Sequence, residues 1–172
     1  MSNNFIIQRE RASDCSHICR VNQRAFESSE EAELVKTLRA EGSLRHSLIA
    51  LCGNNVVGHV AVANASISCN SNIIPVLSVA SLSVDPSFQG MGVGARLLNS
   101  VINDCMLERE TLLFVLGHRD YYPRFGFMPA DQFGLRWEHA APRDTFMVLP
   151  LKYGALKNVF GRVRCSESVE VV

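Results

Sequence analysis

The sequence has no excess of charge of either sign. Lysine and arginine together number 17, as do aspartate and glutamate, so the formal net charge at pH 7 is zero. A chain without surplus positive charge is a poor candidate for binding nucleic acid through the phosphate backbone. The longest stretch without an acidic or basic residue, 46–84, is interrupted by glycine, asparagine, histidine and proline. We therefore expect no nucleic-acid partner and no membrane-spanning helix.

The six cysteines include no pair with the CxxC spacing of metal and redox sites. Cys15 and Cys19 are four positions apart without a second pair nearby, so no metal site is expected. Residues 1–4 have neither the basic start nor the apolar core of a secretion signal. We expect reduced thiols and a cytoplasmic location.

The order of the predicted elements favours a mixed α/β (α+β) fold with a mostly antiparallel sheet. Strand patterns cover 5–9, 47–52, 56–65, 76–84, 111–116 and 145–149, and helix patterns follow 13–14 and 28–29 and cover 95–107. The stretch 76–84 has no charge and suits a strand that is buried on both faces. The basic residues of 152–164 are expected on a solvated surface. No linker or repeat is visible, so a single domain over 1–172 is expected.

Glycines gather between the strand 76–84 and the helix 95–107, in the sequence Gln89-Gly90-Met91-Gly92-Val93-Gly94. Glycine lets the backbone approach a ligand, and the free N–H groups of a helix start attract phosphate or pyrophosphate. A plain flexible turn is the alternative. A Walker A loop is excluded because no lysine follows.

A dinucleotide-binding fingerprint is a weaker alternative for the same loop. Gly90, Gly92 and Ala95 match its spacing, but residues 85–89 separate the strand from the first glycine. The next strand also ends in Val115-Leu116-Gly117, without the acidic residue that binds the ribose. A nucleotide-dependent oxidoreductase therefore ranks far below the readings that follow.

The loop from Gln89 to Gly94 resembles the acyl-CoA pyrophosphate loop of the GNAT N-acetyltransferase superfamily. Residues 82–86 resemble that family's strand into the loop, and 122–127 resemble its second signature, a tyrosine four residues before Gly-Phe. Segments 31–39 and 116–127 are similar to the YhbS-type predicted acetyltransferases. The resemblance covers 5–161 and implies one GNAT-like domain in which a splayed central strand pair is flanked by helices.

The resemblance implies acetyl-CoA as co-substrate and no metal. The family's pantetheine arm bonds to the strand backbone, here Leu82, Ser83 and Val84. The pyrophosphate is held by backbone N–H groups, here those of Gln89, Gly90, Met91, Gly92, Val93, Gly94 and Ala95.

Tyr122 matches the family's general-acid tyrosine, which protonates the leaving thiolate. Aromatic packing is the alternative for Tyr122, and Tyr121 is its near neighbour. Glu31 fits the family pattern best as the general base, against the alternative of a solvated acidic helix face. Other candidates for the base are Glu27, Glu30, Glu33, His59 and His118.

The function implied is direct transfer of an acetyl group from acetyl-CoA to a primary amine of an unknown acceptor, either a small molecule or a peptide. A non-catalytic module that binds or senses acyl-CoA is the alternative. Dimers are common among such enzymes, so a homodimer is one expected state. Trp137, Phe133 and Phe146 are expected in the core, with an acceptor pocket as the alternative.

Overall fold

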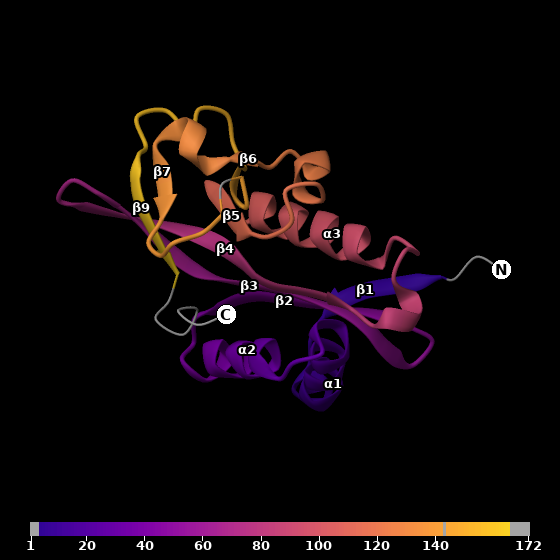
Figure 1. The fold of residues 1–172 in the computed structure, drawn as a ribbon. Coiled ribbons are helices and arrows are strands. Elements are labelled where there is room, and N and C mark those ends of the chain that lie inside the picture. The colour runs from indigo at the N-terminus through magenta and orange to yellow at the C-terminus, as the bar shows by residue number, and fades with distance from the viewer. Residues whose placement is uncertain (1–3, 143, 166–172) are drawn as a thin grey trace. The chain divides into compact units, whose positions relative to one another are not determined.

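The computed structural model describes residues 4–142 and 144–165 (Figure 1). The chain forms two compact units. The first unit holds residues 4–62 and 80–101, and the second holds 63–79 and 102–165. Two long strands, β3 (Asn55–Cys69) and β4 (Asn72–Val84), run through both units and are joined by a tight turn. Each unit is described in turn.

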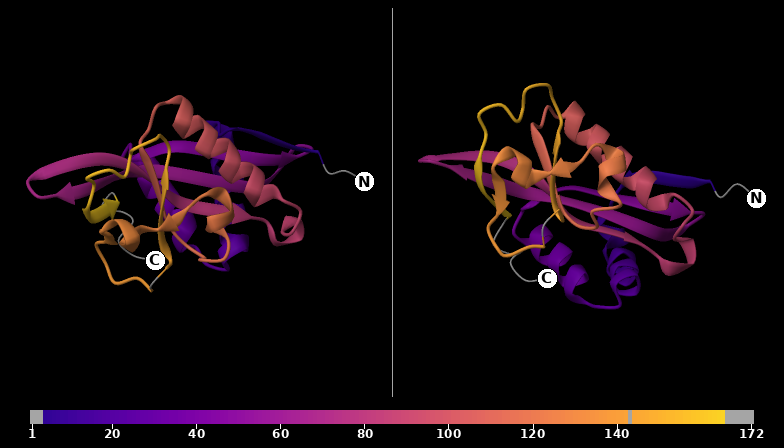
Figure 2. Two further views of the ribbon diagram at one scale, coloured as in Figure 1. Left: turned by 90° about the horizontal axis from the view of Figure 1, so that it is seen from above. Right: turned by 45° about the horizontal axis from the view of Figure 1, so that its top comes forward.

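The first unit places helices on both faces of its strands. Its strand order is β1 (Phe5–Arg9), β2 (Leu44–Cys52), β3 and β4, and β1 and β2 are antiparallel with Phe5 opposite Cys52. Helices α1 (Cys15–Phe26) and α2 (Glu30–Ala40) lie on one face, and the start of α3 (Val93–Leu107) lies on the other (Figures 1 and 2). The strand predicted over 5–9 is confirmed.

The core under α1 and α2 follows from their apolar spacing. Ile18 of α1 and Val35 of α2 pack against Ile49 and Ala61 of the strands, and all four are at most 2% exposed. Leucines and valines at three- and four-residue intervals form one helical stripe, and burial of that stripe stabilises a short helix more than its propensity does. The predicted apolar face of α2 is therefore correct.

The second unit is built on a mixed set of strands. β5 (Leu112–Leu116) runs parallel to β4 over Leu77–Val79 and antiparallel to β8 (Phe146–Pro150), which also pairs with β6 (Met128–Pro129). β9 (Gly161–Cys165) runs antiparallel to β3 and parallel to β7 (Leu135–Trp137). Antiparallel pairings dominate those of the described residues. The predicted class, a mixed α/β fold with an open mixed sheet, is confirmed.

Two predicted elements need correction. Helix α3 begins at Val93, not at residue 95, so Val93, Gly94 and Ala95 form its first turn. Residues 161–165, interpreted above as basic surface, form β9. Arg162 and Arg164 are exposed, whereas Val163 and Cys165 are buried, which is the alternation of a strand with one covered face.

Candidate functional site

The loop after β4 starts from a fixed point at Asp85. The Asp85 N–H donates to Val57 O on β3 at 2.9 Å. The Asp85 carboxylate accepts from Ser87 N at 3.0 Å and lies 3.1 Å from Arg24 Nε on α1. Because the Asp85 side chain is only 14% exposed, this ion pair is partly shielded from solvent. The end of β4 is thus tied to both β3 and α1.

The side chain of Gln89 folds back onto the strand. Its Nε2 donates to Val84 O at 3.1 Å. The preceding Phe88 ring meets Phe5 edge to face, with the ring centroids 6.3 Å apart. Gln89 therefore closes the loop through its side chain and leaves its backbone for any ligand.

The two glycines that follow adopt a backbone conformation that other residues rarely take. Gly90 has φ +75° and Gly92 has φ +81°. A Cβ built on either glycine would meet no atom within 4 Å, so the space on that side is open. Backbone conformation, not packing, therefore requires glycine here. The open space leaves room for a ligand against the backbone.

The first turn of α3 supplies hydrogen-bond donors next to these glycines. The first helical hydrogen bond is donated by Arg96 N to Gly92 O at 3.1 Å. The N–H groups of Val93, Gly94 and Ala95 precede it, where a helix offers no acceptor of its own. With the positive end of the helix dipole behind them, these donors suit pyrophosphate oxygens.

Gly58 of β3 lets this helix start lie directly on the strands. A Cβ on Gly58 would be 2.9 Å from both Val93 Cγ1 and Leu97 Cδ1 and 3.2 Å from Ser83 O. Val93 and Leu97 are at most 1% exposed, so neither has free space to move into. The position of the donors therefore depends on a residue without a side chain more than thirty positions away.

The strand residues predicted to hold the pantetheine arm are partly covered. Leu82 and Val84 are half-buried, and Ser83 is 1% exposed. Within the described residues the Ser83 hydroxyl is buried without a hydrogen-bond partner. All ten predicted cofactor residues lie in the first unit, in one continuous stretch of chain from Leu82 to Ala95.

A buried chain of polar side chains runs beneath β4 in the first unit. Ser81 Oγ donates to Asn22 Oδ1 at 2.9 Å, and Asn22 Nδ2 lies 3.4 Å from His59 Nδ1. His59 Nε2 lies 2.8 Å from Ser47 Oγ, which donates to Glu10 Oε2 at 2.5 Å. Such a set is stable only when every member has a partner, and these five side chains do.

Burial sets the protonation of the two titratable members. Complete burial lowers the pKa of His59 to about 4, against a smaller raising effect of Glu10. Burial alone raises the pKa of Glu10, but the hydrogen bonds from Arg39 and Ser47 outweigh it and hold that pKa below its ordinary value. Neutral His59 accepts from Asn22 at Nδ1 and donates to Ser47 at Nε2, so neither ring nitrogen is open to an acceptor amine.

The candidate bases on α2 differ in their surroundings. Glu33 is exposed and pairs with Lys36 at 3.3 Å, as a solvated helix face does. Glu31 is half-buried, and its Oε2 is a buried oxygen without a hydrogen-bond partner in the described part of the chain. An unpartnered buried carboxylate oxygen is costly unless something else uses it. This feature distinguishes Glu31 from its neighbours.

Tyr122 lies in the second unit, on the single turn Tyr122–Phe125 after β5. The ring packs flat on Gly117, where a Cβ would come within 2.4 Å of Tyr122 Cε2. It also meets the rings of Tyr121 and Phe127 edge to face. Burial, followed by the effect of Tyr121, raises the pKa of Tyr122 to about 12, so the phenol is protonated at neutral pH.

Tyr121 is engaged differently from Tyr122. The Arg124 guanidinium carbon lies 4.1 Å from the centroid of the Tyr121 ring, a cation–π contact. Tyr121 also packs against Phe125 with the centroids 5.3 Å apart. The two neighbouring tyrosines thus have distinct surroundings, as expected of adjacent residues on a tight turn.

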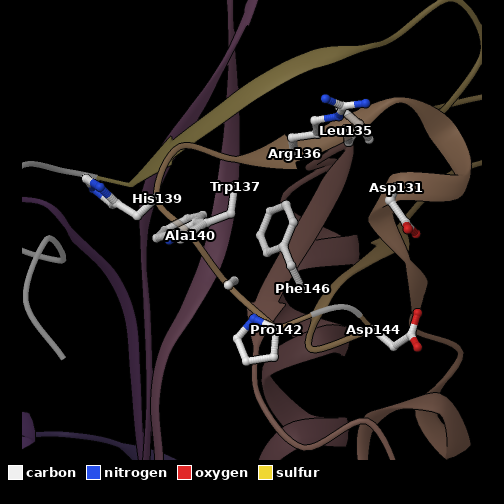
Figure 3. A pocket seen from close by; sticks show the side chains of 10 residues that line it. Asp131, Leu135, Arg136, Trp137, His139, Ala140, Pro142, Asp144 and Phe146 are labelled. Carbon is white, nitrogen blue, oxygen red and sulfur yellow. The ribbon is translucent and has the colours of Figure 1, made fainter.

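The second unit also contains a pocket that the sequence patterns did not define. Its volume is about 540 Å³ (Figure 3). It is lined by Asp131, Leu135, Arg136, Trp137, His139, Ala140, Ala141, Pro142, Asp144 and Phe146. Trp137 and Phe146, expected in the core or in an acceptor pocket, take part in both, whereas Phe133 packs only against the core. The charged lining residues were missed because loop residues have no periodicity to reveal them.

Two searches for other features gave plain results. Among residues 4–142 and 144–165, no three His, Cys, Asp or Glu side chains are grouped so as to hold a metal ion. No helix in that part of the chain combines the length and the apolar character that crossing a membrane requires.

Comparison with known proteins gives consistent matches. Residues 7–130 match the model of a family described as an acetyltransferase (GNAT) domain. The uncharacterized N-acetyltransferase YjhQ of Escherichia coli is 41% identical over 164 residues, 92% of this chain and 90% of that protein.

Two crystal structures are also similar. The GNAT family N-acetyltransferase YhbS from Escherichia coli, in complex with CoA, has a TM-score of 0.92 at 28% identity and covers 98% of this chain and 93% of its own. A GNAT family acetyltransferase from Brucella melitensis, in complex with acetyl-CoA, has a TM-score of 0.80 at 25% identity, with coverages of 96% and 98%.

Proposed function

Because the chain belongs to the GNAT acetyltransferase family, we propose that it transfers an acetyl group directly from acetyl-CoA to a primary amine. Membership confirms the resemblance predicted from the sequence, the YhbS-type group included, and the enzyme class, an acetyl-CoA-dependent N-acetyltransferase. The proposal keeps residues 1–172 as one acyltransferase domain that acts in the cytoplasm, alone or as a homodimer, on a small-molecule or peptide amine.

The observation that carries the proposal is the glycine loop at the start of α3. Open space at Gly90 and Gly92 adjoins the N–H groups of Val93, Gly94 and Ala95, and this geometry fits a pyrophosphate. The backbone of Leu82, Ser83 and Val84 leads into the loop and would hold the pantetheine arm. Acetyl-CoA supplies the activated thioester, and the chain binds and orients it.

The reaction moves two protons. The acceptor nitrogen bonds to the acetyl carbonyl carbon while the carbon–sulfur bond breaks, the nitrogen loses a proton, and the leaving thiolate gains one. Glu31 is the proposed base, supported by its buried and unpartnered Oε2. Holding both substrates in one site removes much of the entropic barrier, so no residue needs to be acylated.

Tyr122 is the proposed general acid. A pKa of about 12 keeps its phenol protonated, and therefore a donor, throughout the neutral range. A thiol has an ordinary pKa of about 8.5, so full transfer from this phenol is unfavourable until negative charge develops on the sulfur. Tyr122 would therefore act mainly as a hydrogen-bond donor whose effect is greatest as the carbon–sulfur bond breaks.

Substitution at Gly92 tests the proposal. Gly92→Glu places a negative charge and a side chain in the open space before α3, so the affinity for acetyl-CoA should fall at least tenfold. Gly154→Glu is the matched control, because Gly154 also has positive φ, +75°, and open space, but lies outside the loop. Equal affinity of wild type and Gly92→Glu for acetyl-CoA would refute the loop assignment.

A non-catalytic module that binds or senses acyl-CoA is the second candidate. It predicts the same effect of Gly92→Glu but no release of CoA with any acceptor. Incubation with acetyl-CoA and a panel of amines, amino acids, aminoglycosides and peptides, with free thiol as the readout, separates the two. Release that depends on an acceptor supports the enzyme.

A further inference from the structure

The pocket of the second unit has an apolar aromatic wall. The Trp137 and Phe146 ring centroids are 5.3 Å apart, and the planes are inclined at 47°. Phe146 in turn stacks on Phe114 of β5 at 5.3 Å, so the wall is fixed to the core of the unit. A volume of about 540 Å³ lies within the range of small-molecule sites.

The same pocket carries two carboxylates. Asp131 and Asp144 line it from two different segments, and Figure 3 shows both side chains on the same side of the Phe146 ring. Neither carboxylate has an ion-pair partner among the described residues. By contrast, Glu138, beside the pocket, is already paired with Arg164 at 2.5 Å and lies 3.6 Å from His139. The two aspartates are therefore free to bind a cation.

The pocket lies at the end of β5 that carries the proposed acid. Phe146, the first residue of β8, is opposite Leu116, the last residue of β5. The next residue, Gly117, donates its N–H to Thr145 O at 2.9 Å, and the Tyr122 ring packs on Gly117. The aromatic wall and Tyr122 are thus joined by one short run of backbone.

We propose that this pocket binds the acceptor and that the acceptor is a cationic amine with an aromatic or similarly flat apolar body. The apolar body lies against Trp137 and Phe146, and the ammonium group is held by Asp131 and Asp144. An ammonium beside an indole ring also gains from the ring's negative face. This inference rests on the proposed function, because it identifies the substrate class for that reaction.

Trp137 is the only tryptophan of the chain, so its fluorescence reports on this pocket alone. The full-length protein is titrated with 2-phenylethylamine, and with 2-phenylethanol as the neutral analogue of similar shape. We expect a saturable change in Trp137 emission with the amine and at least tenfold weaker binding of the alcohol. Equal binding of amine and alcohol, or no response to the amine, would overturn the inference.

Variants separate the carboxylates from general charge effects. Asp131→Asn and Asp144→Asn should each weaken binding of 2-phenylethylamine about threefold to tenfold, because each removes one charge at the ammonium. Glu33→Gln, which removes an exposed carboxylate from α2 outside the pocket, should leave the affinity unchanged. If the two aspartate variants bind the amine as the wild type does, the inference is wrong.

A parallel titration with acetyl-CoA keeps this inference separate from the proposed function. Binding of acetyl-CoA without binding of the aromatic amine would refute the pocket assignment and leave the proposed transfer intact. Binding of the amine without binding of acetyl-CoA would support the pocket as a cation site and refute the transfer. Release of CoA in the presence of both ligands would support the two together.

Discussion

Acidification should destabilise the protein through His59. The pKa of this imidazole is about 4 in the folded state, because of complete burial, and about 6.5 in the unfolded chain. Between these values the unfolded chain binds a proton that the folded protein does not, so stability falls as the pH falls. A difference of about 2.5 pKa units corresponds to about 3 kcal/mol lost between pH 7 and pH 4.

Urea unfolding at several pH values from 7 to 4 measures this loss, with His59→Gln as the comparison. Glutamine keeps a donor and an acceptor but cannot titrate, so the variant should be less stable at pH 7 and depend less on pH. Glu10 adds its own loss below pH 5 in both proteins, since its pKa is also lowered on folding. Parallel pH profiles, or a His59 ring that titrates near 6.5 by NMR, would refute the reasoning.

Three other substitutions affect the loop or the phenol. Gly58→Ala should lower stability by about 1–3 kcal/mol and weaken acetyl-CoA binding, because its Cβ clashes with α3, and adding Val93→Ala should restore part of both in thermal melts and titrations. Asp85→Ala removes the acceptor of Ser87 N and should cost about 0.5–2 kcal/mol by urea unfolding. Tyr122→Phe should reduce kcat roughly 100-fold in steady-state assays and leave acetyl-CoA affinity unchanged, whereas unchanged turnover would remove Tyr122 as the acid.

Local sequence patterns predicted the regular elements well. The strand 5–9 and the apolar face of α2 follow from spacing alone, because each buries one face and the period exposes that face. The start of α3 was placed two residues late, because glycine and valine have modest helix propensity and the packing of Val93 against β3 decides the boundary.

Long-range features could not be predicted in the same way. The requirement for glycine at position 58 comes from Val93 and Leu97, which are distant in sequence. The alternation of 161–165 was visible, but its basic residues suggested surface, and pairing with β3 is what makes it a strand. The carboxylates of the pocket lie in loops, where no period reveals which side chains converge.

The motifs identified the family because two signatures occur in the right order. The loop before α3 and the segment that contains Tyr122 each have a weak pattern alone, and together they agree with the family model over residues 7–130. The roles proposed for Tyr122 and Glu31 remain predictions. Surroundings that a sequence cannot supply, a buried phenol and an unpartnered carboxylate oxygen, now support them.

Calorimetric titration with acetyl-CoA, beside CoA and NAD, tests the central claim most directly. The account predicts that acetyl-CoA and CoA bind to one site per chain and that NAD does not, since the loop has the geometry of an acyl-CoA pyrophosphate site. Absence of binding by both CoA species would contradict the loop assignment, and the roles of Tyr122 and Glu31 would fall with it.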